Sequence, residues 1–174
     1  VLSGMSPEEE QQFADFVRER GDHLLRFARY LIPDANEAED LLQAALLRLV
    51  KHWSRPLESP EAYVRTTLVN LAKDRRRRAH LVAVPVEISL DHADESPEML
   101  DALAAQARLD HVLSQLPERQ RTTVVLRVLE GLSEAETATA MGCAVGTVKS
   151  NLARGLHRVR QVLAAPDENE GTAS

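Results

Sequence analysis

Two rows of polar and basic side chains, placed at helical spacing, have the donors and acceptors that bind nucleic acid. In the C-terminal half, one row recurs at i, i+4, i+7 and i+11: Ser150, Arg154, His157 and Gln161. Hydroxyl, guanidinium and imidazole groups on one helix face suit base edges in the major groove, where Arg can hold guanine through two hydrogen bonds. We therefore predict that this C-terminal polar row contacts DNA.

Two more residues near the start of the same helix are predicted to bind the phosphate backbone. Lys149 lies nearer the apolar side, from which its flexible stem can reach a phosphate. Thr147 lies where the N-terminus of a helix can hold a phosphate. The stripe expected to face the core is apolar: Val148, Leu152, Leu156, Val159 and Leu163.

The second row, the central polar row, lies in a stretch rich in arginine. Its members follow at helical spacing: Thr66, Asn70, Lys73 and Arg77. The stripe expected to face the core is again apolar: Val64, Leu68, Leu71 and Ala72. Asn70 is a poor helix former, so a contact to a base would explain its position within a helix. Arg76 belongs to the arginine run 75–78, whose charges would neutralise phosphates and make the affinity fall with salt.

Both rows have a plainer explanation as solvated basic helix faces. Four arginines in succession, however, exceed what is needed to complement a helix dipole. In the C-terminal half, Ser133 and Glu136 form a predicted capping box, and the short helix that follows stops at Gly142. A second helix begins shortly afterwards and has no acidic residue from 145 to 162. This arrangement is that of a helix-turn-helix and favours DNA binding over a solvated face.

A third line of residues indicates contact with a protein. Asp40, Gln43 and Leu47, here called the Asp40 row, recur at i, i+3 and i+7 in a predicted helix over residues 35–53. They lie away from the apolar side of that helix. A leucine beside exposed polar residues is a weak indication of a protein partner.

The elements that must position these rows are helices. Apolar residues recur at spacings of three and four almost throughout, and prolines punctuate the pattern, so the sequence predicts an all-α fold. Helices are expected at 7–20, 22–32, 35–53, 60–78, 97–115, 118–130, 134–141 and 145–163.

The chain is expected to form two small helical domains. All six aromatic residues precede an acidic stretch at 79–96 in which no helical period survives, so the later part needs an aliphatic core of its own. We predict domains at 7–80 and 108–165, joined by an acidic, flexible linker at 81–107, and a disordered tail at 166–174.

Composition excludes several classes of protein. The net charge of −6 would by itself argue against nucleic acid, but residues 65–78 carry six bases against one acid. The single cysteine excludes an internal disulfide and a zinc site made of cysteines alone. The histidines have no metal-ligand spacing, and no catalytic motif or long apolar stretch occurs. We expect a cytoplasmic protein that is not an enzyme and has no cofactor, metal, membrane or small-molecule substrate.

Three segments, taken in order, resemble the two-domain, extracytoplasmic-function branch of the sigma-70 family of bacterial transcription initiation factors. Residues 38–48, AEDLLQAALLR, are similar to its core-polymerase-binding segment. Residues 63–78, with Asn70, Asp74 and Arg77, are similar to its −10 promoter segment. Residues 116–121 and 146–154, with GTVKS at 146–150, are similar to its −35-reading domain.

The resemblance implies roles for the three rows. The Asp40 row would dock on the clamp coiled coil of core RNA polymerase. Asn70 and its neighbours would hold the opened non-template strand of the −10 element, whereas Ser150, Arg154 and the residues around them would contact the −35 element as duplex. Core RNA polymerase and promoter DNA are thus the implied partners. Whether an anti-sigma factor also binds the chain is left open by the sequence. A stand-alone helix-turn-helix regulator with an N-terminal sensing domain remains the alternative.

Two residues depart from the family pattern in the helix-turn-helix. Ala144 stands where the family usually has a serine cap, whose loss costs about 1 kcal/mol. Thr137 stands where isoleucine is usual. We expect its hydroxyl to bond to a carbonyl one turn back.

Overall fold

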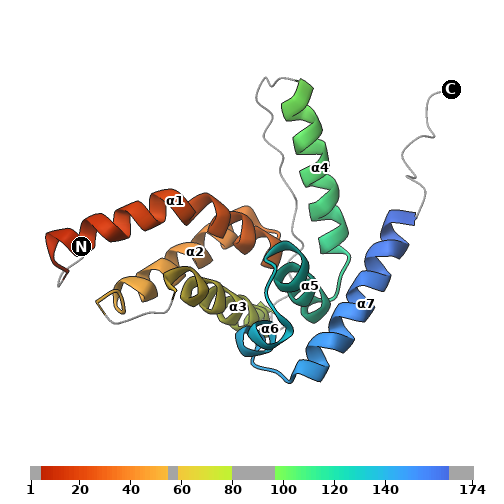
Figure 1. Ribbon diagram of the computed structural model, residues 1–174. Helices are drawn as coiled ribbons and strands as arrows, with labels where there is room; N and C mark the ends of the chain where they lie inside the picture. The colour runs from red at the N-terminus through yellow and green to blue at the C-terminus, as the bar shows by residue number, and fades with distance from the viewer. Residues whose placement is uncertain (1–4, 55–58, 80–96, 165–174) are drawn as a thin grey trace. The chain divides into compact units, whose positions relative to one another are not determined.

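The computed structural model describes residues 5–54, 59–79 and 97–164, and all regular structure within these ranges is helical (Figure 1). The all-α prediction is confirmed. The described residues form two compact units: one consists of α1, α2 and α3 with residues 138–142, and the other of the remaining residues of α4 to α7. Of the expected linker 81–107, residues 97–107 are helical; the rest of it and the tail 166–174 lie outside the described residues.

Helix α1 (Pro7–Leu31) is one continuous helix, so the predicted break at Gly21 is wrong. It begins with a capping box, in which the Ser6 hydroxyl accepts from the Glu9 amide and the Glu9 carboxylate accepts from the Ser6 amide. Gly21 alone does not end the helix, because the apolar side continues past it to the buried Leu24 and Phe27. That burial outweighs the roughly 1 kcal/mol by which glycine disfavours a helix.

Helix α2 (Ala35–Val50) starts at the cap Asp34, whose carboxylate accepts from the Glu37 amide at 2.8 Å. It ends three residues before the expected 53, because residues 51–54 form a turn in which His52 and Trp53 donate to carbonyls three residues back. This turn brings Trp53 against Phe13 and Phe16 of α1, with ring centroids 5.2 and 5.7 Å away.

Helix α3 (Pro60–Ala79) begins after Ser59, whose hydroxyl accepts from the Ala62 amide at 3.2 Å. The three helices pack on one another around a core of large, fully buried side chains: Leu24, Phe27, Leu31, Leu49, Val64 and Leu68. This core fixes which sides of α2 and α3 face outward.

The second unit has an aliphatic core, as predicted. It is built from α4 (Pro97–Ser114), α5 (Glu118–Val124), the part of α6 (Glu134–Met141) that precedes residue 138, and α7 (Val145–Ala164). Helix α7 packs mainly on α5. The expected helix 118–130 changes after Val124 into a π-helical turn, η1 (Val125–Leu129), where Glu130 donates to the Val125 carbonyl at 3.0 Å. Val125 and Leu126 are buried there, whereas Val128 and Leu129 are exposed.

Candidate nucleic-acid and polymerase interfaces

The C-terminal polar row lies on the outward side of α7. Arg154, His157 and Gln161 are exposed, and within the described residues no hydrogen bond or ion pair engages Arg154 or His157. Ser150 is half-buried, and its hydroxyl donates to the Thr147 carbonyl at 3.1 Å. The predicted orientation of the row is therefore confirmed, while its role stays a prediction.

The buried side of α7 differs from the predicted stripe. Val148 is fully buried, but Leu163 is 66% exposed, so its placement in the core was wrong. The buried line instead continues through Asn151, which is 7% exposed, and Gly155. A Cβ at position 155 would lie 2.7 Å from Val124 Cγ2, so only glycine allows α5 to come this close. The signal that could have indicated this contact is a glycine in the middle of a strongly periodic helix.

Two of the basic residues of α7 are engaged within the second unit. Lys149 Nζ lies 3.5 Å from a carboxylate oxygen of Glu134, the first residue of α6. Arg158 Nε donates to the Gln115 carbonyl at 2.9 Å and so joins α7 to the turn after α4. Thr147 is half-buried in the first turn of α7. The charges left for DNA without an exchange of partners are Arg154 and Arg160 among the described basic residues of α7.

The predicted helix-turn-helix is confirmed in its local geometry. The Ser133 amide donates to Glu136 at 2.7 Å, and the Ser133 hydroxyl accepts from the Glu136 amide at 3.2 Å. These bonds lower the pKa of the Glu136 carboxyl below its ordinary 4.5. Gly142 has φ 60°, as a left-handed helix end requires. At the start of α7, the Ala144 carbonyl accepts from Thr147 and Val148.

Thr137 does not behave as expected. It is fully buried in α6, and its hydroxyl has no hydrogen-bond partner within the described part of the chain. The predicted bond to a carbonyl one turn back is therefore wrong. A buried, unpaired hydroxyl costs free energy that an apolar side chain of the same size avoids.

The central polar row lies on the outward side of α3. Asn70, Lys73 and Arg77 are exposed, and Thr66 is half-buried. Arg77 pairs with Asp74 of its own helix at 2.6 Å. Val64, Leu68 and Ala72 are buried as predicted, with Leu71 half-buried. Arg76 belongs to α3, but its side chain lies outside the described part.

The Asp40 row lies on the outward side of α2. Asp40 and Gln43 are exposed. Leu47 is 65% exposed, although Leu41 and Leu49 of the same helix are buried. Full burial of a leucine is worth about 1.5–3 kcal/mol, so this side chain is a natural point for a partner to cover.

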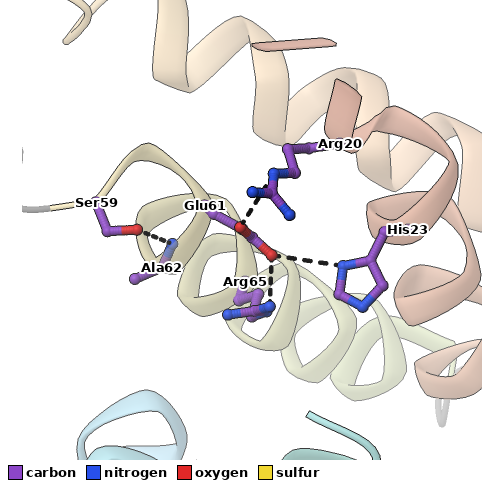
Figure 2. Close-up of polar contacts among 6 residues, drawn as sticks. All are labelled: Arg20, His23, Ser59, Glu61, Ala62 and Arg65. Atoms are coloured by element: carbon purple, nitrogen blue, oxygen red, sulfur yellow. Dashed lines mark hydrogen bonds and ion pairs between the residues drawn. The ribbon is translucent and has the colours of Figure 1, made fainter. Parts of the chain in front are cut away.

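A charged cluster that the sequence did not reveal fixes α3 against α1 (Figure 2). Glu61, in the first turn of α3, accepts from Arg65 at 2.5 Å and lies 3.7 Å from Arg20 Nε and 3.4 Å from His23 Nδ1. Arg20 and His23 belong to α1, so one carboxylate joins the two helices. Arg20 and His23 are distant from Glu61 in sequence, which is why helical spacing gave no signal for the contact between the two helices, whereas Arg65 lies four residues after Glu61.

Residues 5–54, 59–79 and 97–164 contain no group of three or more His, Cys, Asp or Glu side chains placed to hold a metal ion. None of the helices in these ranges has both the length and the apolar character that a membrane crossing requires.

The chain also matches known proteins over both units. Residues 16–81 match the family Sigma-70 region 2, and residues 106–159 match Sigma-70, region 4. It is 41% identical over 160 residues to the RNA polymerase sigma-E factor of Streptomyces coelicolor, covering 90% of this chain and 88% of that protein. It is 34% identical over 155 residues to the ECF RNA polymerase sigma factor SigM of Mycobacterium tuberculosis, covering 87% of this chain and 76% of that protein.

A solved structure has the same fold. The sigma factor RpoE of Bartonella quintana, determined with the anti-sigma factor NepR, aligns with a TM-score of 0.70 and 23% identity, covering 90% of this chain and 99% of that chain. From the two matched regions and the 41% identity, the chain belongs to the sigma-70 family of RNA polymerase sigma factors, in its extracytoplasmic-function (ECF) group.

Proposed function

We propose that this sigma factor binds core RNA polymerase, directs it to promoters through their −10 and −35 elements and assists promoter opening. The observation that supports this most directly is the exposure of two separate polar rows, one on α3 within the region 2 match and one on α7 within the region 4 match. A single DNA-binding unit would need only one such row.

The −35 element is the proposed ligand of α7. Arg154 and His157 project from the helix without a partner among the described residues, so they can bond to base edges in the major groove. Ser150 lies one turn earlier on the same side. Lys149 and Thr147 are assigned to phosphates, which fix the position of the helix without reading sequence.

The −10 element is the proposed ligand of α3. Asn70 supplies amide donors and acceptors to an opened base, and Thr66 lies one turn before it. Lys73, Arg76 and Arg77 are assigned to phosphates of the same strand. The Glu61 cluster supports this proposal, because it holds the start of α3 on α1.

Core RNA polymerase is the proposed partner of the Asp40 row, with Leu47 as its apolar centre. This role involves no covalent chemistry by the chain, so we propose that it is not an enzyme. The same role places it in the cytoplasm, where RNA polymerase acts.

A reconstituted transcription assay tests the proposal. Core polymerase with the chain should start transcription at defined positions that core polymerase alone does not use. The chain alone should not bind promoter duplex tightly in a gel shift. Failure of core polymerase to retain the chain at low ionic strength would overturn the proposal, and tight, specific binding by the free chain would instead favour a stand-alone regulator.

Arg154→Ala tests the assignment of α7. Loss of a bidentate contact to guanine should cost about 1–3 kcal/mol at one base pair of the −35 element and relax the preference there. The measurement is the affinity of the holoenzyme for promoters substituted singly at each −35 position. Arg18→Ala, which removes an exposed arginine of α1 outside both polar rows, is the matched control. An equal loss on every promoter would make Arg154 a phosphate contact.

A further inference from the structure

Within the arginine run at 75–78, Arg75 differs from Arg77 in its contacts, because it pairs with a residue of another helix of the same chain. Its guanidinium lies 2.8 Å from a carboxylate oxygen of Glu37 in the first turn of α2, and both side chains are about 40% exposed. Arg77 is 72% exposed, and its ion-pair partner among the described residues is Asp74, three residues earlier in its own helix. Arg75 therefore joins two helices, whereas Arg77 does not.

Helix geometry explains why the two arginines differ. At 100° per residue, Arg75 is rotated by about 200° from both Lys73 and Arg77. It therefore lies on the other side of α3 from the central polar row, toward α2. A phosphate bound by the central polar row would therefore lie on the opposite side of α3 from Arg75.

Arg75 also faces three acidic groups of α2. Its pKa is raised, chiefly by the hydrogen bond to Glu37; partial burial lowers it, and the charges of Glu37, Asp40 and Asp34 each raise it by less. Asp34 caps α2 through the Glu37 amide, so the first turn of α2 is held by its backbone and by the Glu37 side chain. Asp40, one turn later, begins the Asp40 row.

We propose that Arg75 is a positioning residue that ties the polymerase-facing side of α2 to α3, and that it is not a phosphate ligand. The inference rests on the proposed function, because it assigns Arg75 to the core-binding surface. It divides the arginine run by role: Arg75 sets the geometry of α2, and Arg77 contacts DNA.

Three glutamine variants test this division, since each removes one positive charge. Arg75→Gln should weaken binding to core polymerase about fivefold. Once core polymerase is saturated with the variant, the slope of log promoter affinity against log salt concentration should be unchanged. Arg77→Gln should leave the core affinity unchanged and reduce that slope by about 0.7–0.9. Arg18→Gln, an exposed arginine of α1 paired at i,i+3 with Asp15, should change neither.

Further variants separate positioning from a general loss of stability. Arg75→Lys should retain part of the core affinity that Arg75→Gln loses. The double variant Arg75→Glu with Glu37→Arg, which reverses the ion pair, should bind core polymerase more tightly than either of its single variants. In an Asp40→Asn background, Arg75→Gln should have a smaller effect on core binding, because it acts through the placement of Asp40. A variant that only destabilised the fold would have the same effect in both backgrounds.

The outcomes distinguish the inference from the function on which it rests. If Arg75→Gln lowers the salt slope as Arg77→Gln does while core affinity is intact, Arg75 is a phosphate ligand and the inference is overturned. The same holds if its effect on core binding is independent of Asp40. If the unaltered chain does not bind core polymerase, the proposed function fails and the inference fails with it.

Discussion

Gly155 allows α5 and α7 to approach more closely than any residue with a Cβ atom would permit. In Gly155→Ala the new methyl group would lie 2.7 Å from Val124 Cγ2 and 3.4 Å from the Gln120 carbonyl oxygen. We expect overpacking to cost about 1–3 kcal/mol, more than the roughly 1 kcal/mol that alanine gains in helix propensity. Urea denaturation checks this through the free energy of unfolding.

Gly146 provides the control for that prediction. It also lies in α7, but a Cβ there would meet no atom within 4 Å, so Gly146→Ala should be neutral or stabilise by up to about 1 kcal/mol. The combination of Gly155→Ala with Val124→Ala should lose less than the sum of the single changes. Equal stability of the two glycine variants would show that α5 and α7 are not in this contact.

Thr137 is a site where a substitution should stabilise the chain. Thr137→Val keeps the shape and removes a buried hydroxyl that has no partner among the described residues. We expect a gain of about 1 kcal/mol, seen as a higher urea midpoint with an unchanged slope. Thr123→Val is the control, because the Thr123 hydroxyl is equally buried and donates to the Arg119 carbonyl at 2.7 Å. That variant should gain nothing; a gain of equal size there would contradict the explanation.

At the scale of elements, the cap of α6 should respond to pH. Because the folded pKa of Glu136 lies below its ordinary 4.5, the capping box contributes stability above that value and loses it as the pH falls through the folded pKa. Glu136→Gln keeps a hydrogen-bonding side chain without a titrating group. We therefore expect the variant to lose less stability than the unaltered chain when acidified, measured by urea denaturation at a series of pH values. Parallel acid profiles would exclude this role for Glu136.

The starts of helices were more predictable than their buried sides. The capping box at Ser133 and the helix end at Gly142 are local signals that act within one turn, and the structure confirms both predictions. The π-helical turn of η1 and the continuity of α1 through Gly21 depend on packing elsewhere in each unit, which no local signal contains.

The same distinction holds for the candidate interfaces. The outward orientation of Asn70, Arg154 and Leu47 follows from helical spacing, because each lies opposite a clear apolar stripe. The burial of Asn151 and the exposure of Leu163 depend on where α5 crosses α7, and the pairing of Arg75 with Glu37 depends on where α2 meets α3. Those crossings are tertiary facts that a single sequence does not display.

At the scale of the whole molecule, the chain consists of two units that each have their own core. We expect residues 1–90 and residues 91–174, produced separately, to be helical and to unfold cooperatively, because α1, α2 and α3 pack on one another and α7 packs on α5 and α4. Residues 138–142, which cluster with the first unit, stay in the second fragment in this design. Circular dichroism with thermal or urea denaturation measures this. If either fragment is helical only when mixed with the other, the units are not independent.

The ion pair between Lys149 and Glu134 has a consequence for the search along a genome. Where Lys149 takes up a phosphate, any approaching duplex must first displace a carboxylate. That exchange costs well under about 1 kcal/mol at so exposed a site, and it is the same for every base sequence. It therefore lowers the affinity for every DNA sequence by the same small factor and leaves the ranking of promoters unchanged.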